Sequence, residues 1–216
     1  MGEPIPTRTD PILTLTQWLS PGFPVGSFAY SSGLEQAIAD RVVDAGTLQD
    51  WLADMLAEGS GRTDATLIRA AATQETASEV DACARALCAS AERLLELDAI
   101  GAPFCDQLRV NWGVDVSNLT YPVALGVGVR VLGLPLETAI QMYLHAWVSA
   151  VVSACQRLMG LGQTDAQRII AALAPLCQEI TRDTQDATLD DISSQTFAAD
   201  IATMRHETLS PRIFRT

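Results

Sequence analysis

The chain of 216 residues contains no lysine, so its 14 basic residues are all arginines, and they face 26 acidic residues for a formal net charge of −12. A Walker P-loop, a protein kinase and a Schiff-base enzyme each need a lysine, so these three chemistries are excluded. A chain this acidic repels phosphates, which argues against general nucleic-acid binding. The composition, 48% hydrophobic and 19% charged, is that of a globular protein with a substantial core.

The sequence gives no sign of secretion or of a membrane span. Residues 1–10 lack the apolar core of a signal peptide, and no apolar run reaches the roughly 18 residues that a membrane helix needs. The five cysteines are odd in number and loosely spaced, so we interpret them as reduced thiols. We therefore expect a cytoplasmic protein.

The first elements expected are two helices around an unusual loop. Ile12, Leu15, Trp18 and Leu19 follow the i, i+3, i+4, i+7 spacing of an amphipathic helix. Helical spacing resumes at Leu34, and the residues between are rich in proline, glycine and serine. This pattern predicts helix, loop, helix.

Capping residues predict the next boundaries. Thr47 with Asp50 is typical of a helix start, and Gly59 and Gly61 are expected to end that helix. Thr63 or Asp64 is expected to cap the alanine-rich helix that follows.

A long run of good helix formers predicts one helix over Ser78–Ala99. Gly101-Ala102-Pro103 is expected to break it, and residues 104–112 form a further amphipathic segment.

The second half reads as helical too. Residues 123–132 form a glycine-rich apolar helix, and Pro135–Met159 is nearly apolar on all sides, which predicts a central, buried helix. A helix is expected from 163 to about 183, and residues 188–191 cap a short one, whereas residues 204–216 show no clean period.

These patterns predict an all-α fold, a single-domain bundle of about nine or ten helices with a C-terminal tail. The expected organisation is a flexible N-terminus at 1–10, a helical domain at 11–203 and a tail at 204–216.

No catalytic, metal or cofactor site emerges from the motifs. The only histidines are His145, expected to be a satisfied core residue, and His206 in the tail. A metal site needs two to four convergent ligands, but neither an HExxH nor a CxxC motif is present. The GxSxG motif of a serine nucleophile is absent as well. Glu35 with Asp40, or Asp190 with Asp191, could form paired carboxylates, but we interpret them as residues of solvated helix faces or as caps.

The loop Ser20–Glu35 is the first segment that invites a functional interpretation. It contains Phe23, Phe28 and Tyr30 among several glycines and prolines. It could be an ordered loop packed by its own aromatic residues, or a surface that docks a partner.

The C-terminus is the second such segment. Residues 202–216 hold three arginines and one acid, for a charge of +2, whereas residues 1–201 carry 11 − 25 = −14. The tail could fold back onto its acidic body, or it could recognise a partner and become ordered on binding.

Three stretches, in order along the chain, resemble the UreF-type urease accessory proteins. The first is Ser20–Glu35 (SPGFPVGSFAYSSGLE). The second is Tyr121–Gly126 followed by Arg157-Leu158 and Leu161–Gln163, and the third is Arg205–Glu207 followed by Arg212–Thr216. The resemblance covers residues 12–216, almost the whole chain.

The resemblance implies a non-enzymatic, all-α maturation factor without a cofactor. Such a protein would form a homodimer, bind the accessory protein UreD (also called UreH), recruit the GTPase UreG and help nickel enter apo-urease. The residues implied to face UreG are Tyr30, Gly33, Glu35, Arg157 and Gln163. The tail residues implied to dock UreD are Arg205, His206, Glu207, Arg212, Phe214 and Arg215.

Two other classes remain open at this point. One is a helical small-molecule enzyme that uses the Ser20–Glu35 loop as the lip of a pocket. The other is a helical regulator with an unrelated partner.

Overall fold

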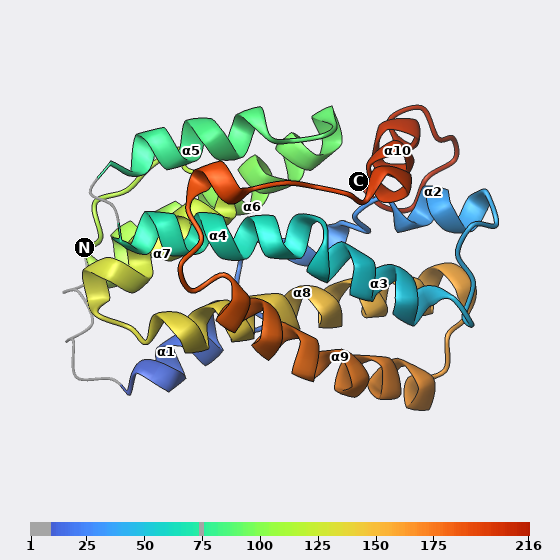
Figure 1. The fold of residues 1–216 in the computed structure, drawn as a ribbon, viewed down its shortest axis with the longest axis horizontal. Coiled ribbons are helices and arrows are strands. Elements are labelled where there is room, and N and C mark those ends of the chain that lie inside the picture. The colour runs from blue at the N-terminus through green and yellow to red at the C-terminus, as the bar shows by residue number, and fades with distance from the viewer. Residues whose placement is uncertain (1–9, 74–75) are drawn as a thin grey trace.

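The computed structural model describes residues 10–73 and 76–216, and within these ranges it contains helices and no strand (Figure 1). The all-α prediction is confirmed. The predicted flexible N-terminus lies outside the described residues except for Asp10, whose side chain caps the first helix by accepting from the Ile12 amide at 2.9 Å. The α-helices are α1 Pro11–Trp18, α2 Leu34–Ala39, α3 Leu48–Ala57, α4 Ser60–Thr73, α5 Ala77–Ala86, α6 Ala91–Trp112, α7 Tyr121–Leu132, α8 Leu136–Met159, α9 Gln163–Asp183 and α10 Phe197–His206. Two short 3₁₀ helices, η1 and η2, span Ser27–Ala29 and Leu189–Asp191.

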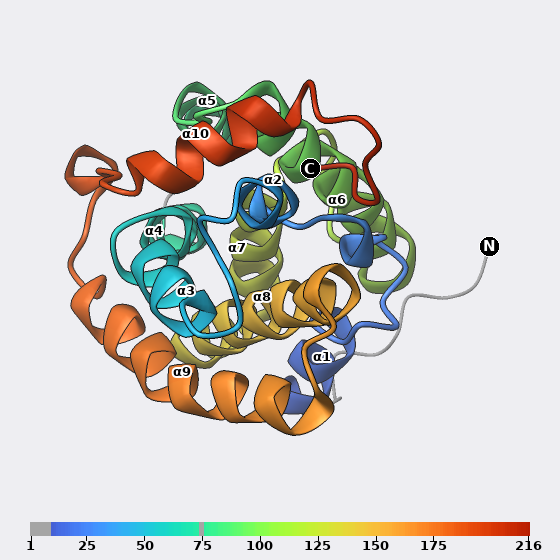
Figure 2. The same cartoon turned by 90° about the vertical axis from the view of Figure 1, so that its right-hand side faces the viewer.

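Helix α7 lies at the centre of the molecule, with the other helices arranged around it (Figure 2). Its residues from Pro122 to Val129 are all buried. A Cβ at Gly126 would lie 2.4 Å from the carbonyl oxygen of Ile68 in α4, so the glycine allows the two helix backbones to touch. The glycine-rich apolar composition of α7 therefore reflects its central position.

Helix α8 is less central than its composition predicts. It packs along α9, and Tyr143, Val148 and Val152 are buried on its inner face. Its outer face is only half-buried, and His145 on that face is exposed. The prediction of a core histidine is therefore wrong. Apolar residues of α8 also occupy the face that does not pack on other helices, so apolar neighbours in the sequence did not mean burial.

The single helix predicted over Ser78–Ala99 is in fact two helices. Helix α5 ends at Ala86, and Ser90 starts α6 by accepting the Arg93 amide at 3.0 Å. Helix α6 then runs through Pro103, where a break was expected. A Cβ at Gly101 would lie 2.2 Å from the Leu119 carbonyl oxygen, so this glycine serves a close contact and not a helix end.

The start of α4 was also placed too late. The helix begins at Ser60, three residues before the expected Thr63 cap. Gly61 lies inside it, where a Cβ would be 2.7 Å from the Leu56 Cα. Tight packing between α3 and α4 thus explains a glycine that suggested a loop.

The C-terminal region contains a helix that periodicity did not predict. Thr188 and Asp191 form the expected capping box at η2, and α10 follows at Phe197–His206. The predicted tail boundary at residue 204 falls inside α10. Apolar residues lie on both faces of this helix, with Ala199 and Ala202 buried and Phe197, Ile201 and Met204 exposed, so no single apolar face marked it.

All five cysteines are unpaired, as predicted, and Cys105, Cys155 and Cys177 are buried. Burial raises the pKa of the Cys155 thiol to about 12. None of the helices described is both long and apolar enough to cross a membrane.

Candidate functional site

The Ser20–Glu35 loop is shaped by glycines and anchored by aromatic residues. Gly26 and Gly33 both have positive φ, and a Cβ at Gly33 would lie 2.7 Å from the Thr203 side chain of α10. Phe23 and Tyr30 are buried, whereas Phe28 in η1 is 66% exposed. The loop is therefore an ordered part of the core that displays one aromatic ring.

The C-terminal tail lies beside this loop, at the end of the molecule that carries α2 and α10 (Figures 1 and 2). The amide and hydroxyl of Ser31 both donate to the Thr216 carbonyl oxygen at 2.7 Å, and the Arg215 amide donates to the Ala29 carbonyl oxygen at 2.9 Å. Phe214 and Thr216 are buried. The tail is thus folded back on its own body, the first of the two arrangements that the sequence left open.

Four ionisable side chains attach the tail, and we call them the carboxylate clamp: Glu35, Glu92 and His206, which are buried, and Arg212, which is exposed. Glu35 accepts the backbone amides of Ile213 and Phe214 at 2.7 and 2.8 Å. His206 is fully buried, with Nδ1 2.7 Å from Glu92 and Nε2 3.2 Å from Glu35. Glu92 also accepts from Arg212 at 2.8 Å.

The Glu35 carboxylate has the hydrogen bonds that a buried carboxylate needs. Glu35 is only 7% exposed, and burying a carboxylate is costly unless it is paired and hydrogen-bonded. Its two oxygens receive three donors, two from the tail backbone and one from α10. Glu35 therefore holds the tail, and the expectation that it lies on a solvated helix face is wrong, because its carboxylate is buried against the tail amides.

Arg157 connects the loop with the tail from α8. Its guanidinium donates to the Phe28 carbonyl oxygen at 3.0 Å and lies 4.5 Å above the centre of the Phe214 ring. A cation over an aromatic face contributes roughly 0.5–1 kcal/mol at an exposed site. Arg157 itself remains exposed, so one side of it is available to a partner.

The structure brings most of the implied residues into one site. Seven of them belong to the loop, the clamp or the tail: Tyr30, Gly33, Glu35, His206, Arg212, Phe214 and Arg215. Arg157 of α8 contacts both the loop and the tail. Two further residues lie at the edge: Arg205 pairs with Asp40 at 2.7 Å, and Glu207 accepts the Ala91 amide at 3.1 Å. Gln163 is exposed at the start of α9, and no hydrogen bond in the described residues ties its side chain to the clamp.

Below the clamp lies a second buried polar network that the sequence reasoning missed. Arg93 donates to both oxygens of Asp64 at 2.7 and 2.9 Å, and the Tyr143 hydroxyl donates to Asp64 at 2.7 Å. The Thr216 hydroxyl reaches Glu96 at 3.4 Å, and burial raises the pKa of Glu96 although Arg93 opposes this. Acids and arginines inside helical patterns gave no signal, because they are equally common on solvated faces.

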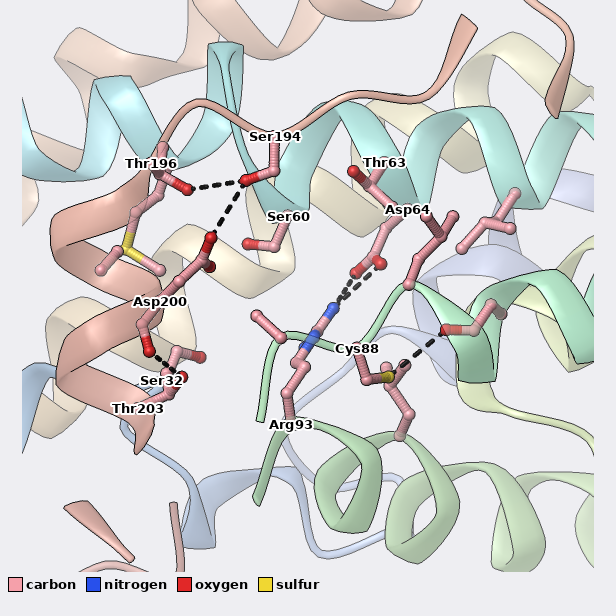
Figure 3. A pocket seen from close by; sticks show the side chains of 17 residues that line it. Ser32, Ser60, Thr63, Asp64, Cys88, Arg93, Ser194, Thr196, Asp200 and Thr203 are labelled. Carbon is pink, nitrogen blue, oxygen red and sulfur yellow. Dashed lines mark hydrogen bonds and ion pairs between the residues drawn. The ribbon is translucent and has the colours of Figure 1, made fainter. Parts of the chain in front are cut away.

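Two cavities adjoin this network. The smaller, about 80 Å³, lies beneath α10, and its lining combines apolar side chains with several hydroxyls around the Asp64–Arg93 pair (Figure 3). Ser194 joins Thr196 and Asp200 at its rim at 3.2 and 3.3 Å. Within the described residues no group of three or more His, Cys, Asp or Glu could hold a metal ion.

The larger cavity, about 670 Å³, lies between the loop and the outer face of α8 and is mostly apolar. The loop thus does form the lip of a pocket, as the enzyme alternative required. However, Arg93, Glu96 and Tyr143 at its wall are bonded to other side chains of the network. The lining is therefore better suited to apolar contact with another molecule than to catalysis.

Helix α10 carries an exposed apolar stripe that the sequence analysis also missed. Phe197, Ile201 and Met204 are 70%, 52% and 47% exposed and are spaced i, i+4, i+7, so they share one face. In the tail, Ile213 is 70% exposed. The spacing was a readable signal, but without a helix assignment it had no face to define.

Comparison with known proteins identifies the family. The UreF family model matches residues 42–174. Relatives described as urease accessory protein UreF are 48% identical in Roseobacter denitrificans, over 96% of this chain and 95% of the relative, and 46% identical in Ruegeria pomeroyi, over 95% and 96%. A relative in Rhodopseudomonas palustris with the same description is 44% identical over 93% of this chain and 89% of its own length. UreF proteins are accessory proteins and not enzymes, and with these matches over nearly its whole length the chain belongs to the UreF family of urease accessory proteins.

Proposed function

We propose that this protein promotes nickel insertion into apo-urease by presenting docking surfaces to UreD and to the GTPase UreG. The observation that supports this most directly is the union of the loop and the tail in one site. Both segments resemble UreF proteins, and the clamp makes each depend on the other. The nickel and the GTP chemistry would then belong to the partners, since this chain has no P-loop lysine.

We propose that UreD docks on the surface formed by the tail and α10. His206 and Phe214 are buried, so their part in this interaction is to hold the surface in shape, while Arg205, Glu207 and Arg212 remain exposed. The apolar stripe Phe197, Ile201 and Met204 supplies the desolvated centre that a stable interface needs.

Charge substitutions in the stripe test this assignment. Ile201→Asp should abolish co-purification with UreD and lower nickel-dependent urease activation, because a carboxylate would be buried without a partner. Val131→Asp is the matched control, since Val131 in α7 is also exposed (54%) and lies on another helix. Undiminished UreD binding by Ile201→Asp would argue against the α10 surface.

We also propose that the protein forms a homodimer whose two subunits contact each other through the outer face of α8. The large apolar cavity and the half-buried residues of that face support this, since monomers rarely expose large apolar patches. Ser149→Arg, on that face, should convert the dimer to a monomer in sedimentation equilibrium. A wild-type protein that sediments as a monomer would refute the dimer.

A further inference from the structure

His206 differs from the other members of the carboxylate clamp, because histidine is the residue whose charge changes near neutral pH. Its ring is fully buried at the end of α10, with Nδ1 2.7 Å from Glu92 and Nε2 3.2 Å from Glu35. A neutral imidazole has one N–H donor and one bare nitrogen. In the neutral form, the lone pair of one nitrogen would therefore point at a carboxylate in a place that water does not reach.

The two carboxylates already have other donors in place. The two oxygens of Glu35 accept two backbone amides of the tail, at 2.7 and 2.8 Å. Glu92 accepts from Arg212 at 2.8 Å through the oxygen that does not face His206. A hydrogen on either carboxyl group would compete with these donors, whereas an imidazolium uses both of its N–H groups as donors. The additional proton therefore fits on the ring.

The charge balance of the clamp leads to the same assignment. With an imidazolium, the clamp carries two negative and two positive charges and is neutral as a whole. The neighbouring charged groups of α2, α6 and α10 have contacts of their own: Arg205 with Asp40 at 2.7 Å, Glu207 with the Ala91 amide at 3.1 Å, and Glu96 with Arg93 at 3.5 Å. A neutral His206 would leave one negative charge of the clamp without compensation, which is costly in a protein interior.

We propose that His206 is an imidazolium while the tail is docked and that loss of its proton releases the tail, so that the clamp is a pH-sensitive attachment. The two carboxylates that His206 contacts are the same two that hold the tail, Glu35 through backbone amides and Glu92 through Arg212. Deprotonation would leave these carboxylates to repel each other and the bare ring nitrogen. Opening of the clamp relieves this repulsion, because water then reaches all three groups.

The direction of the pH effect follows from the number of bound protons. An exposed histidine loses its proton near about pH 6.5. Above that pH, the docked state holds one proton more than the released state, in which water reaches His206. The docking equilibrium should therefore fall as the pH rises, by up to about tenfold per pH unit.

Two measurements on the purified full chain test the proposal. In nitrogen-15 NMR of the histidine side chains, His206 should show a hydrogen on both ring nitrogens at about pH 7. In amide hydrogen exchange, the protection of the Phe214 amide, corrected for the intrinsic exchange rate, should fall relative to the α7 amides between about pH 7 and about pH 9. The fall should reach up to about tenfold per pH unit and accompany the loss of the His206 proton.

A pair of variants assigns the effect to His206. His206→Gln removes the charge and keeps a polar side chain, so it should lower Phe214 protection at about pH 7 by about tenfold or more and abolish its pH dependence. His145→Gln is the matched control, because His145 is exposed on the outer face of α8, and it should keep the wild-type profile. The wild-type measurements need no variant, so they decide the question even where His206→Gln weakens the whole fold.

Three results would each overturn the proposal. The first is a bare ring nitrogen on His206 while Phe214 is protected, and the second is Phe214 protection that does not change with pH. The third is a pH dependence that survives in His206→Gln, because it would then come from another group such as Glu96. None of these measurements includes a partner, so their failure leaves the proposed function standing. Where the tail docks UreD, as proposed above, UreD binding should weaken over the same pH range, and that consequence alone rests on the proposed function.

Discussion

Replacing Glu35 by glutamine tests the carboxylate clamp with the smallest possible change in shape. The wild-type carboxylate accepts three hydrogen bonds, from the amides of Ile213 and Phe214 and from His206. A glutamine keeps one acceptor oxygen and turns its amide N–H group toward one of these donors. We therefore expect Glu35→Gln to release the tail without unfolding the helices.

The expected magnitude follows from these contacts. A hydrogen bond to a charged group contributes about 1.5–3 kcal/mol, and a buried donor left unsatisfied costs about 1–3 kcal/mol. Oε1 makes one of these bonds and Oε2 makes two, so a glutamine loses at least one of them. The loss in tail docking should then be about 2–4 kcal/mol, which corresponds to about a 30- to 1000-fold change in the docking equilibrium.

Amide hydrogen exchange measures this directly. Protection of the Phe214 amide should fall by that factor in Glu35→Gln, while amides in the central helix α7 keep their protection. Glu207→Gln is the matched control, because Glu207 is an exposed acid of the same tail with a single bond, to the Ala91 amide. It should leave Phe214 protected.

Unchanged Phe214 protection in Glu35→Gln would refute the clamp as the attachment of the tail. Equal loss of protection throughout α7 would refute it in another way, since Glu35 would then stabilise the whole fold and not the tail in particular.

Two further predictions concern the body of the protein. Gly101→Ala should lower the free energy of unfolding by about 1–3 kcal/mol, because the new Cβ would meet the Leu119 carbonyl oxygen at 2.2 Å. Gly22→Ala is the control and should change the free energy of unfolding little, because the nearest atom to its Cβ lies at 3.6 Å. Equal urea denaturation curves for the two variants would contradict this prediction. Burial raises the pKa of Glu96, so between its unfolded and folded pKa values the native state holds a proton that the unfolded state lacks, and this group lowers stability as pH rises through that window. The stability of wild type relative to Glu96→Gln should therefore fall as pH rises from about 4.5, the value for an unperturbed glutamate, and a constant difference in urea denaturation across pH 4.5–7 would speak against it.

Helix boundaries were predictable where the signal was local. Pro135, Gly133 and the Thr188–Asp191 capping box all mark ends of elements where the sequence placed them. Prediction failed at Gly61 and Gly101, because both glycines lie inside helices and make room for another backbone. From the sequence alone, a glycine that makes room for a distant segment looks the same as a glycine that forms a turn.

The candidate site shows the same division. The sequence by itself determined an all-α UreF-like chain without lysine, and it singled out the loop and the tail as the segments that matter. Only the tertiary structure decided that these two segments form one site. Glu35 and Phe214, which are hydrogen-bonded to each other, are about 180 residues apart along the chain. The physical reason is that a buried carboxylate must find donors, and Glu35 finds them in backbone amides of the tail, which carry no signal in a sequence.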